Sequence, residues 1–398
     1  MYEWEKVKVG DIGKVITGKT PKTYNSEYYG GNIPFLTPSD DMSVKYVRRT
    51  NKYITELGRL SVKNATLPAN AICVSCIGSD LGKVVITTQE TVTNQQINSI
   101  VVDTDKFDID FVYYSMLELG KVLNFHSKTS TAVPIVNKSS FSQYEIDCPK
   151  LNTQKRIGAI LSSIDKKIEE NNQINNNLLQ QALAVYKAWF CDYVLSDGVL
   201  PESWHITTID ALSSLVTRGI APKYDDSSNQ IVLNQKCIRD HTIDVSLARR
   251  HLQKRINEKW ISKGDLLINS TGTGTLGRVA QVWFDTNNMT VDSHVTIVRP
   301  KAPILQSYIG FWGFSHESEI EAQHTGSTGQ TELPRDRVKA LELLLPDEDT
   351  LIKFNGLVIP MTDIVVSNQK ENARLSQLRD TLLPKLMSGE FDVSTIEI

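Results

Sequence analysis

The sequence has few features of a secreted, membrane-bound or disulfide-linked protein. Its 398 residues include five cysteines, an odd and scattered set that favours a reducing cytoplasm over a disulfide framework. No stretch reaches the roughly 18 consecutive apolar residues of a membrane helix. The start, MYEWEKVKVG, has no apolar run that could serve as a signal peptide. We therefore expect a cytoplasmic protein without a membrane partner.

The patterns of common catalytic centres are missing as well. None of the 14 prolines are neighbours, which excludes the usual Asn-Pro-Pro-Tyr/Phe pocket of an amino-methyltransferase. Cys73 and Cys76 have the spacing of half a zinc site, but no second pair exists, so burial in a strand is favoured. The acidic pairs Asp40–Asp41 and Asp225–Asp226 stand in polar loops, where we expect solvated carboxylates. We expect no catalytic centre and no metal site.

Two glycine-rich stretches imitate nucleotide-binding motifs. GKVITGKT, residues 13–20, matches the phosphate loop G-x-x-x-x-G-K-[ST], and GTGTLG, residues 272–277, matches the dinucleotide fingerprint G-x-G-x-x-G. Both motifs require a helix whose N-terminal amides face the phosphates. The first is followed by turn formers and the second by RVAQVWF, which is typical of a strand. Both stretches are therefore interpreted as turns, and an ATP-hydrolysing enzyme is the weakest alternative.

The most informative feature is an internal duplication with a period near 200 residues. WEKVKVGDIGKVITGKTPK begins at Trp4 and WHITTIDALSSLVTRGIAPK at Trp204. VRRTNKYITE is paralleled by ARRHLQKRINE, and ICVSCIGSDLGKV by LINSTGTGTLGRV, which ends on the same Leu-Gly-basic-Val. The second copy lacks the Gly-Lys-Thr of the first, which also argues against a phosphate loop. The chain is two copies of one module.

Each copy combines a strand-rich module with a long helix. Residues 1–150 alternate short β-favouring runs with turns and include one expected helix near residues 109–123, and residues 196–346 repeat this plan. In residues 151–195 and 347–398, apolar residues recur at three- and four-residue steps, which predicts helices from Thr153 to Tyr193 and from Asp349 to Met387. Pro360 is expected to bend or interrupt the second.

The two apolar stripes are too narrow to close a core alone, so we expect the helices to pack together as an antiparallel coiled coil. A tandem duplication would then have a pseudo-twofold axis, with the modules at opposite ends of a rod. Forty residues of helix span roughly 60 Å. Asparagines interrupt both stripes near their centres, where a few could fix the register. The predicted fold class is α+β, with two tandem α/β recognition domains separated by two long antiparallel helices.

Basic residues gather at two places in a chain whose formal net charge is −3. Residues 236–263 hold eight Lys or Arg against three acids, and residues 45–63 hold six against one. Tyrosines flank both runs, at Tyr46, Tyr53 and Tyr224. A charge run is usually only a solvated face, but two runs at corresponding places favour nucleic-acid binding.

With these features the chain resembles the specificity subunits of type I restriction–modification enzymes. The stretches that carry the resemblance are ITGKTPK, SCIGSDLGKV, STGTGTLGRV, CPKLNTQKRIGAILSSID, ALAVYKAWFCDY and LRDTLLPKLMSGEF. The resemblance covers essentially the whole chain and is most specific in the helical segments. It implies a non-catalytic subunit that reads a bipartite target in double-stranded DNA, with two methyltransferase (M) subunits and restriction (R) subunits as partners.

The resemblance further implies that S-adenosylmethionine, ATP and Mg²⁺ belong to the partner subunits, so that this chain binds no cofactor. The candidate DNA-binding residues are Lys19, Lys22, Arg48, Arg49, Lys83, Lys223, Lys236, Arg249, Arg250 and Arg278. Lys83 and Arg278 are weaker candidates, because each could simply cap a turn. The alternative from another class is a duplicated carbohydrate- or protein-binding scaffold that uses the helices for spacing.

Overall fold

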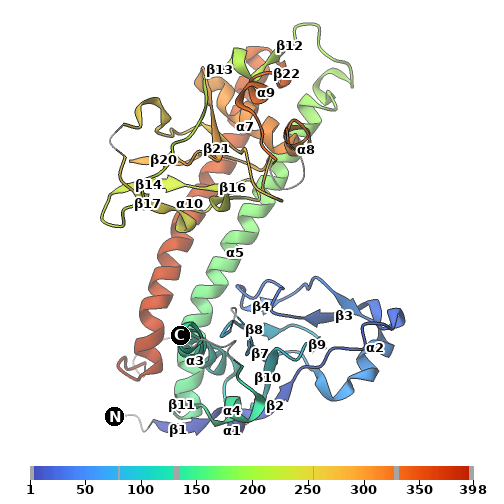
Figure 1. The fold of residues 1–398 in the computed structure, drawn as a ribbon, viewed down its shortest axis with the longest axis vertical. Coiled ribbons are helices and arrows are strands. Elements are labelled where there is room, and N and C mark those ends of the chain that lie inside the picture. The colour runs from blue at the N-terminus through green and yellow to red at the C-terminus, as the bar shows by residue number, and fades with distance from the viewer. Residues whose placement is uncertain (1–3, 79–80, 130–134, 254, 327–330, 394–398) are drawn as a thin grey trace. The chain divides into compact units, whose positions relative to one another are not determined.

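The computed structural model describes residues 4–78, 81–129, 135–253, 255–326 and 331–393 (Figure 1). It divides into two compact units. Unit 1 comprises Met1–Glu170 and Glu371–Ile398, and unit 2 comprises Asn171–Lys370. Each unit therefore holds one globular module together with one half of each long helix.

In unit 1 the central sheet has the strand order β2-β10-β7-β8-β4, and a second sheet has the order β5-β3-β9-β6. The strands of unit 1 are β1 (Glu5–Lys8), β2 (Gly13–Thr17), β3 (Tyr29–Leu36), β4 (Tyr46–Val47), β5 (Tyr53–Ile54), β6 (Thr66–Leu67), β7 (Ile72–Ser75), β8 (Val84–Thr87), β9 (Thr91–Thr93), β10 (Ile97–Val102) and β11 (Glu145–Cys148). Its helices besides α5 and α10 are α1 (Val9–Ile12), α2 (Glu56–Ser61), α3 (Ile109–Thr129) and α4 (Lys138–Gln143).

The central sheet of unit 1 is buried on both faces, so its inner strands are mostly apolar. Ile72 and Val74 of β7 point into a core shared with α3, whereas Cys73, between them, points into the core on the other face. This alternation follows from the two-residue period of a strand. The short β-favouring runs expected in this module include AICVSCI, KVVIT and INSIVV, which form β7, β8 and β10. The expected helix near residues 109–123 is confirmed as α3.

Unit 2 repeats the plan, with the order β13-β21-β18-β19 in its main sheet and β17-β14-β20 in a second. Its elements are β12 (His205–Thr208), α6 (Ile209–Leu212), β13 (Ser213–Arg218), β14 (Gln230–Leu233), β15 (Ile238–Arg239), β16 (Thr242–Ile243), β17 (Arg249–His251), β18 (Leu266–Asn269), β19 (Val279–Gln281), β20 (Met289–Val291), β21 (Val295–Pro300), α7 (Gln306–Ser315), α8 (Glu317–Ala322), α9 (Arg335–Lys339) and β22 (Glu342–Leu345).

The strand orders confirm the duplication. β2-β10-β7-β8 corresponds to β13-β21-β18-β19, and the pairing of β1 with β11 corresponds to that of β12 with β22. The correspondence extends to single glycines. A Cβ on Gly18 would lie 2.0 Å from the carbonyl oxygen of Asn94, and one on Gly219 would lie 2.0 Å from that of Val291. Both copies therefore need glycine where the strand approaches the neighbouring backbone.

The long helices are confirmed as α5 (Leu151–Phe190) and α10 (Glu348–Met387). In unit 1 their halves pack together through Ile157 and Leu161 of α5 and Leu383 and Leu386 of α10. In unit 2, Tyr186 and Phe190 of α5 pack against Phe354 of α10, with Tyr186 and Phe354 ring centroids 6.1 Å apart. Because residue numbers rise along one helix as they fall along the other, the pairing in each unit is antiparallel.

The expected interruption at Pro360 is wrong, because α10 is one helix on both sides of it. Proline fixes φ near the helical value and removes one backbone hydrogen bond, to the carbonyl four residues earlier. That earlier residue is Gly356, around which a Cβ would meet nothing within 4 Å. The open surroundings of Gly356 are consistent with a helix that absorbs the proline.

By length and composition, one helix in the described residues, α10, could cross a membrane, and 33% of the relevant segment is buried in the structure. Apolar residues near both ends of α10 pack into the cores of the two units. Leu351, Phe354 and Val358 lie in the core of unit 2, and Leu383 and Leu386 lie in the core of unit 1. Packing against the modules therefore accounts for much of its apolar character.

Candidate nucleic-acid interface

The segment GKVITGKT forms a strand and a pinned loop. Residues Gly13–Thr17 are β2, and Gly18 donates its backbone N–H to the carbonyl of Ile97 at 3.0 Å. Lys19 donates its backbone N–H to Thr93 at 2.8 Å. In unit 2, Gly219 and Ile220 make the same two bonds, to Val295 and Val291. The expectation that no helix follows this loop is confirmed, since the next helical element is the short turn Ser26–Tyr28.

The loop nevertheless presents basic groups on the surface of unit 1. Lys19 lines a shallow cavity of about 340 Å³ together with Lys63, Ser61 and Asn64. Two ammonium groups, a hydroxyl and an amide around one recess offer hydrogen-bond donors and positive charge, which suits a phosphate oxygen. Lys63 lies in the basic run of residues 45–63, and the fold brings it to Lys19 from a distant part of the sequence.

A second basic cluster lies in unit 2, where the segment after β13 runs alongside β17. Leu252 donates its backbone N–H to Lys223 at 2.8 Å, and Asp225 donates to Arg250 at 3.2 Å. This backbone pairing brings together Lys223, Arg249 and Arg250, all of which are exposed. Arg250 Nη1 also donates to the carbonyl oxygen of Ser228 at 2.8 Å. The structure thus joins three of the predicted residues in one place.

Each unit also places a cation beside an exposed tyrosine. In unit 2 the Arg249 guanidinium carbon lies 3.4 Å from the centre of the Tyr224 ring, and in unit 1 the Lys22 ammonium lies 5.7 Å from that of Tyr24. Tyr24 is 80% exposed and Tyr224 45%. The two tyrosines belong to the matching segments PKTY and PKY, whereas their cations differ: Lys22 lies in the same segment as Tyr24, and Arg249 comes to Tyr224 from β17. An exposed aromatic held beside a cation can stack on a base while the cation contacts a phosphate.

The acids beside the unit 2 cluster take part in local turns. The Asp225 carboxylate accepts hydrogen bonds from the backbone N–H and the hydroxyl of Ser227, at 2.9 and 2.6 Å. These bonds, the hydroxyl first, lower the pKa of Asp225 below its usual value. The carboxylate is therefore held in its own turn.

The double arginines of the two copies are not equivalent, contrary to the sequence parallel. Arg48 and Arg49 follow β4, which pairs with β8, whereas Arg249 and Arg250 lie in β17, which pairs with β14. By its pairing, β17 corresponds to β5. Arg48 is ion-paired with Glu169 of α5 at 2.8 Å, and Arg49 is exposed. Arg48 therefore has a partner within unit 1.

The basic run of residues 45–63 is also not a continuous solvated face. The Lys45 side chain is only 8% exposed, and its ammonium lies 2.7 Å from Asp110 and 4.7 Å from the centre of the Tyr114 ring. Burial, followed by the charge of Asp110, raises the pKa of Tyr46 to about 12. Arg59 is engaged by Glu56 and Glu90. Lys45 therefore stabilises the joint between module and helix.

The remaining candidates lie at turns. Lys83 and Arg278 follow Gly82 and Gly277, whose φ values of 91° and 83° explain the shared Leu-Gly-basic-Val. Lys83 is exposed and Arg278 half-buried. Lys236 is exposed in a short turn capped by the Asn234 side chain. None of these three joins the clusters of Lys19 or Arg249 through an interaction among the described residues.

Two other groups of residues have structural roles. Cys73 lies in β7 and Cys76 directly after it; both are buried as expected, and burial raises their pKa values to about 12 and about 11. Asp40 is not the solvated acid that was expected. It is buried, and its carboxylate accepts from the backbone N–H groups of Thr37 and Asn51 at 2.7 and 2.5 Å. It fixes the loop before β4.

Comparison with known proteins identifies the module. The family model described as "Type I restriction modification DNA specificity domain" matches residues 1–180. The type I restriction enzyme MjaIX specificity subunit of Methanocaldococcus jannaschii is 25% identical over 99% of this chain and 95% of its own length. Residues 1–180 therefore belong to this specificity-domain family, and the chain as a whole is similar to type I restriction enzyme specificity subunits.

A second relative and a solved structure agree with this assignment. The type I restriction enzyme HindI specificity subunit of Haemophilus influenzae is 33% identical over 43% of this chain and 38% of its own length. The crystal structure of the type I restriction–modification system S subunit from M. genitalium covers 97% of this chain and 96% of its own. It aligns with a TM-score of 0.59 at 15% identity, which demonstrates a shared fold. The predicted fold class and family are confirmed.

Proposed function

We infer that this specificity subunit reads double-stranded DNA through its two modules and itself carries out no catalysis. The observation that carries the inference is the duplicated module. The main sheets share the orders β2-β10-β7-β8 and β13-β21-β18-β19, and in each copy an exposed tyrosine of the matching segments PKTY and PKY lies beside a cation. A duplicated scaffold that holds similar groups at similar places is suited to contact two neighbouring stretches of one duplex.

The two modules should read different sequences. Their basic segments differ, KYVRRTNKYITELG in one and RRHLQKRINEKW in the other, and their double arginines lie on non-equivalent strands. The target is therefore bipartite and asymmetric. We propose that α5 and α10 set the distance between its halves. Major-groove sites on one face recur about every 10 to 10.5 base pairs, so half-sites of a few pairs would leave roughly six to eight pairs unread.

Specificity subunits of this family work with methyltransferase and restriction subunits, and we propose that this one recruits two methyltransferase subunits. Trp189 and Phe190, near the end of α5, offer these subunits little apolar surface, because Phe190 is buried and Trp189 half-buried. Helix α10 does present exposed apolar residues: Ile352, Leu357, Ile359 and Ile364 are 44–55% exposed. Apolar residues repeated along one helix favour protein–protein contact.

If catalysis belongs to the partner subunits, the cofactors should bind there as well. We propose that S-adenosylmethionine, ATP and Mg²⁺ bind to the partner subunits and that the assembled enzyme acts in the cytoplasm, where its DNA substrate lies. The loop of residues 13–20 supports this proposal. The backbone N–H groups of Gly18 and Lys19 donate to the carbonyl oxygens of Ile97 and Thr93, so they are not available to bind a phosphate.

Duplex binding by the complex with methyltransferase subunits tests the inference against the alternative of a carbohydrate- or protein-binding scaffold. We expect tight binding to one DNA sequence, with an affinity that falls steeply as salt rises, because Lys and Arg displace counterions from phosphates. A complex that binds no duplex, or binds all duplexes equally at physiological salt, would contradict it. Oligosaccharide binding with no DNA binding would favour the alternative.

A further inference from the structure

The turns that lead into β10 and β21 have the same backbone hydrogen bonds in the two modules. In unit 1 the backbone N–H of Gln96 donates to the side-chain oxygen of Asn94 at 3.1 Å. In unit 2 the backbone N–H of His294 donates to the side-chain oxygen of Asp292 at 2.9 Å. In each turn the residue that follows donates its N–H to the backbone carbonyl of Asn94 or Asp292, at 3.2 and 3.1 Å. The two turns are therefore equivalent parts of the duplicated module.

The side chains at the tips of these turns differ. Unit 1 has Gln95 and Gln96 there, and unit 2 has Ser293 and His294. Gln95 and His294 are exposed, and Gln96 and Ser293 are half-buried. A shared backbone with different polar side chains at its tip suits two modules that each read a different sequence, because side-chain donors and acceptors read the base edges.

Neighbouring side chains orient the two glutamines of unit 1. The Thr20 hydroxyl donates to Oε1 of Gln95 at 2.7 Å, and Nδ2 of Asn94 donates to Oε1 of Gln96 at 2.8 Å. Each glutamine can then use the N–H groups of Nε2 and the second lone pair of Oε1 for a ligand. An amide that offers a donor and an acceptor side by side pairs with N7 and N6 of adenine in the major groove.

The turn of unit 1 lies beside cations that suit a phosphate. Lys19 precedes Thr20 and donates its backbone N–H to Thr93, two residues before Gln95. The Lys19 side chain lines the recess that also contains Lys63. Phosphate contacts position a protein on a duplex, whereas base contacts determine the sequence that it reads. The loop and the turn together provide both kinds of group.

In unit 2 a chain of hydrogen bonds orients His294. Its Nδ1 lies 2.8 Å from the hydroxyl oxygen of Thr271. Nε2 of Gln235 donates to the same hydroxyl oxygen and to the Thr271 carbonyl, the latter at 2.9 Å. The hydroxyl can therefore give its own hydrogen to Nδ1, which leaves Nε2 as the N–H donor of the exposed ring. Such a donor suits the N7 and O6 acceptors of guanine.

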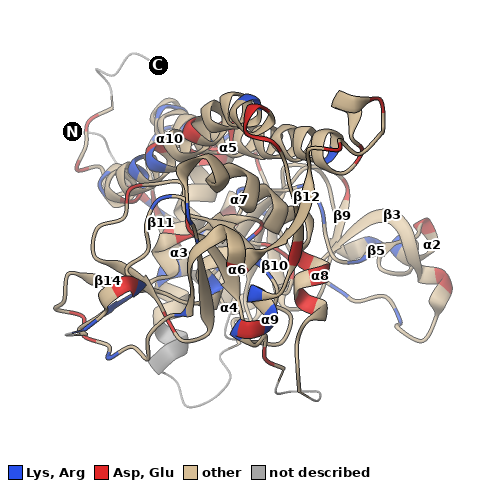
Figure 2. Ribbon diagram, turned by 90° about the horizontal axis from the view of Figure 1, so that it is seen from above, with Lys and Arg blue, Asp and Glu red and all other residues tan. Residues whose placement is uncertain are grey.

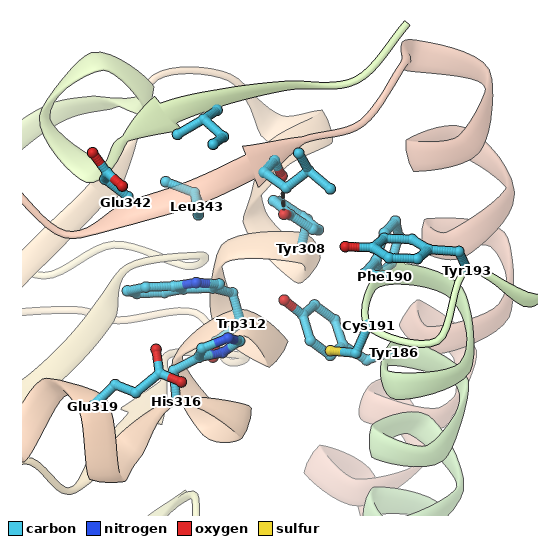
Figure 3. Close-up of a pocket in the computed structure, with 12 residues that line it drawn as sticks. Tyr186, Phe190, Cys191, Tyr193, Tyr308, Trp312, His316, Glu319, Glu342 and Leu343 are labelled. Carbon is cyan, nitrogen blue, oxygen red and sulfur yellow. Dashed lines mark hydrogen bonds between the residues drawn. The ribbon is translucent and has the colours of Figure 1, made fainter. Parts of the chain in front are cut away.

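A recess of about 410 Å³ at the C-terminal end of α5, also in unit 2, does not offer such groups (Figure 3). Its rings Tyr186, Phe190 and Tyr308 are only 1–5% exposed and pack on one another, with centroids 5.0–5.9 Å apart. Glu319 and Glu342 are exposed at its edge, and Figure 2 shows much of α8 in red. Because carboxylates repel the phosphates of DNA, this part of unit 2 is not suited to contact the duplex.

We propose that Gln95 and Gln96 contact bases in the half of the target read by unit 1, and that His294 contacts a base in the half read by unit 2. This inference rests on the proposed function, which supplies the duplex, and goes beyond it by naming residues that determine the sequence. The matching turns place these side chains at equivalent positions. The change from two glutamines to serine and histidine then gives the two halves different sequences.

Binding to altered duplexes tests each residue. The target is first identified by sequencing the sites that the wild-type complex with methyltransferase subunits methylates. Fluorescence anisotropy then measures the affinity of the complex for this target and for duplexes in which one base pair is changed. Gln95→Ala, Gln96→Ala and His294→Ala should each bind the target about tenfold more weakly, but should lose no affinity for the duplex changed at the contacted pair. The pairs affected by the two glutamines should lie in one half of the target, and the pair affected by His294 in the other.

The matched controls are Gln89→Ala and His205→Ala, since Gln89 in unit 1 and His205 in unit 2 are exposed and lie outside the two turns. Both should discriminate among the duplexes as the wild-type chain does. Gln95→Glu keeps the size of the side chain but replaces its N–H donors by a carboxylate oxygen. It should shift the preferred base at the same pair toward cytosine, whose N4 offers donors.

The outcomes separate this inference from the proposed function. If the three alanine variants bind every duplex more weakly by one common factor, the residues only stabilise the turns and the inference is overturned. It is also overturned if these variants discriminate among duplexes as the wild-type chain does, or if His294 and the glutamines affect the same half. If the wild-type complex prefers no duplex, the proposed function itself fails.

Discussion

Asn368 of α10 donates its side-chain amide to the side-chain oxygen of Asn175 of α5, at 2.8 Å. Asn175 is buried and Asn368 half-buried, so the two amides meet at a largely dry position of the antiparallel helix pair in unit 2. A shift of either helix by one residue would leave Asn175 buried without this partner. The pair therefore fixes the register of α5 against α10.

Substituting Asn368 alone should be costly. Asn368→Leu removes the partner of the buried Asn175 amide, and we expect the free energy of unfolding to fall by about 1–3 kcal/mol. Asn175→Leu with Asn368→Leu should recover most of this loss, because no amide then remains unpaired. Chemical denaturation measures both, with Asn176→Leu as the exposed control. Equal losses in the single and double variants would show that the bond does not fix the register.

His251 should make unit 2 sensitive to acid. It is fully buried in β17, and neither ring nitrogen has a partner in the structure. Burial lowers the pKa of its imidazole below the ordinary value of 6.5. Below about pH 6.5 this imidazole is therefore protonated in the unfolded chain but remains neutral in the folded chain. Stability falls as the pH drops from there through the folded pKa.

Denaturation between about pH 7 and pH 5 checks this behaviour, across the ordinary pKa of histidine. His251→Leu, which cannot take up a proton, should lose less stability over that range than the wild-type chain. At neutral pH the variant should be at least as stable, since it removes two unpaired polar atoms from the core. Parallel pH profiles for the two proteins would rule out His251 as the cause.

The cluster of Lys223, Arg249 and Arg250 should contribute phosphate contacts. Arg249→Gln or Lys223→Gln should weaken DNA binding by the methyltransferase complex and reduce the slope of log affinity against log salt by about one each. Fluorescence anisotropy over a salt series measures this. Lys106→Gln is the matched control, because the Lys106 side chain is 73% exposed and Lys106 is a member of neither cluster. Slopes that stay at the wild-type value would remove these residues from the interface.

Lys19 provides a test of the phosphate-loop imitation. Lys19→Ala should leave nucleotide binding by the isolated chain unchanged, because we expect none, and should weaken DNA binding through the recess that Lys19 shares with Lys63. Titration with a fluorescent ATP analogue and with a labelled duplex separates the two. Measurable ATP binding that is lost in Lys19→Ala would reverse the interpretation of GKVITGKT.

Periodic signals explain how much of the fold could be predicted from the sequence. The apolar steps that define α5 and α10 are local, and the Leu-Gly-basic-Val turns require the positive φ of Gly82 and Gly277 in both copies. Such features depend on a residue and its close neighbours. They therefore predicted helices, turns and the duplication, with helix ends displaced by at most a few residues.

Features that depend on distant parts of the chain were missed. Lys45 belongs to a basic run in sequence, but its side chain is largely covered because Asp110 and Tyr114 of α3 come to it. Asp40 is buried because Thr37 and Asn51 offer it backbone N–H groups. The two double arginines aligned in the sequence, but structural equivalence depends on which strands pair, and β4 and β17 pair with non-equivalent strands. Tyr24 and Lys63 could have been found from the sequence. Tyr24 is an aromatic residue two positions after Lys22, and Lys63 is a cation in the basic run of residues 45–63.

The central claim is that each module reads one half of a bipartite target and that the helices keep the halves apart. The most direct test replaces residues 1–150 with the module of another family member and sequences the sites methylated by the assembled chimera. We predict that one half of the target changes while the other half and the gap stay the same. A continuous target, or a replacement that alters both halves, would contradict the account.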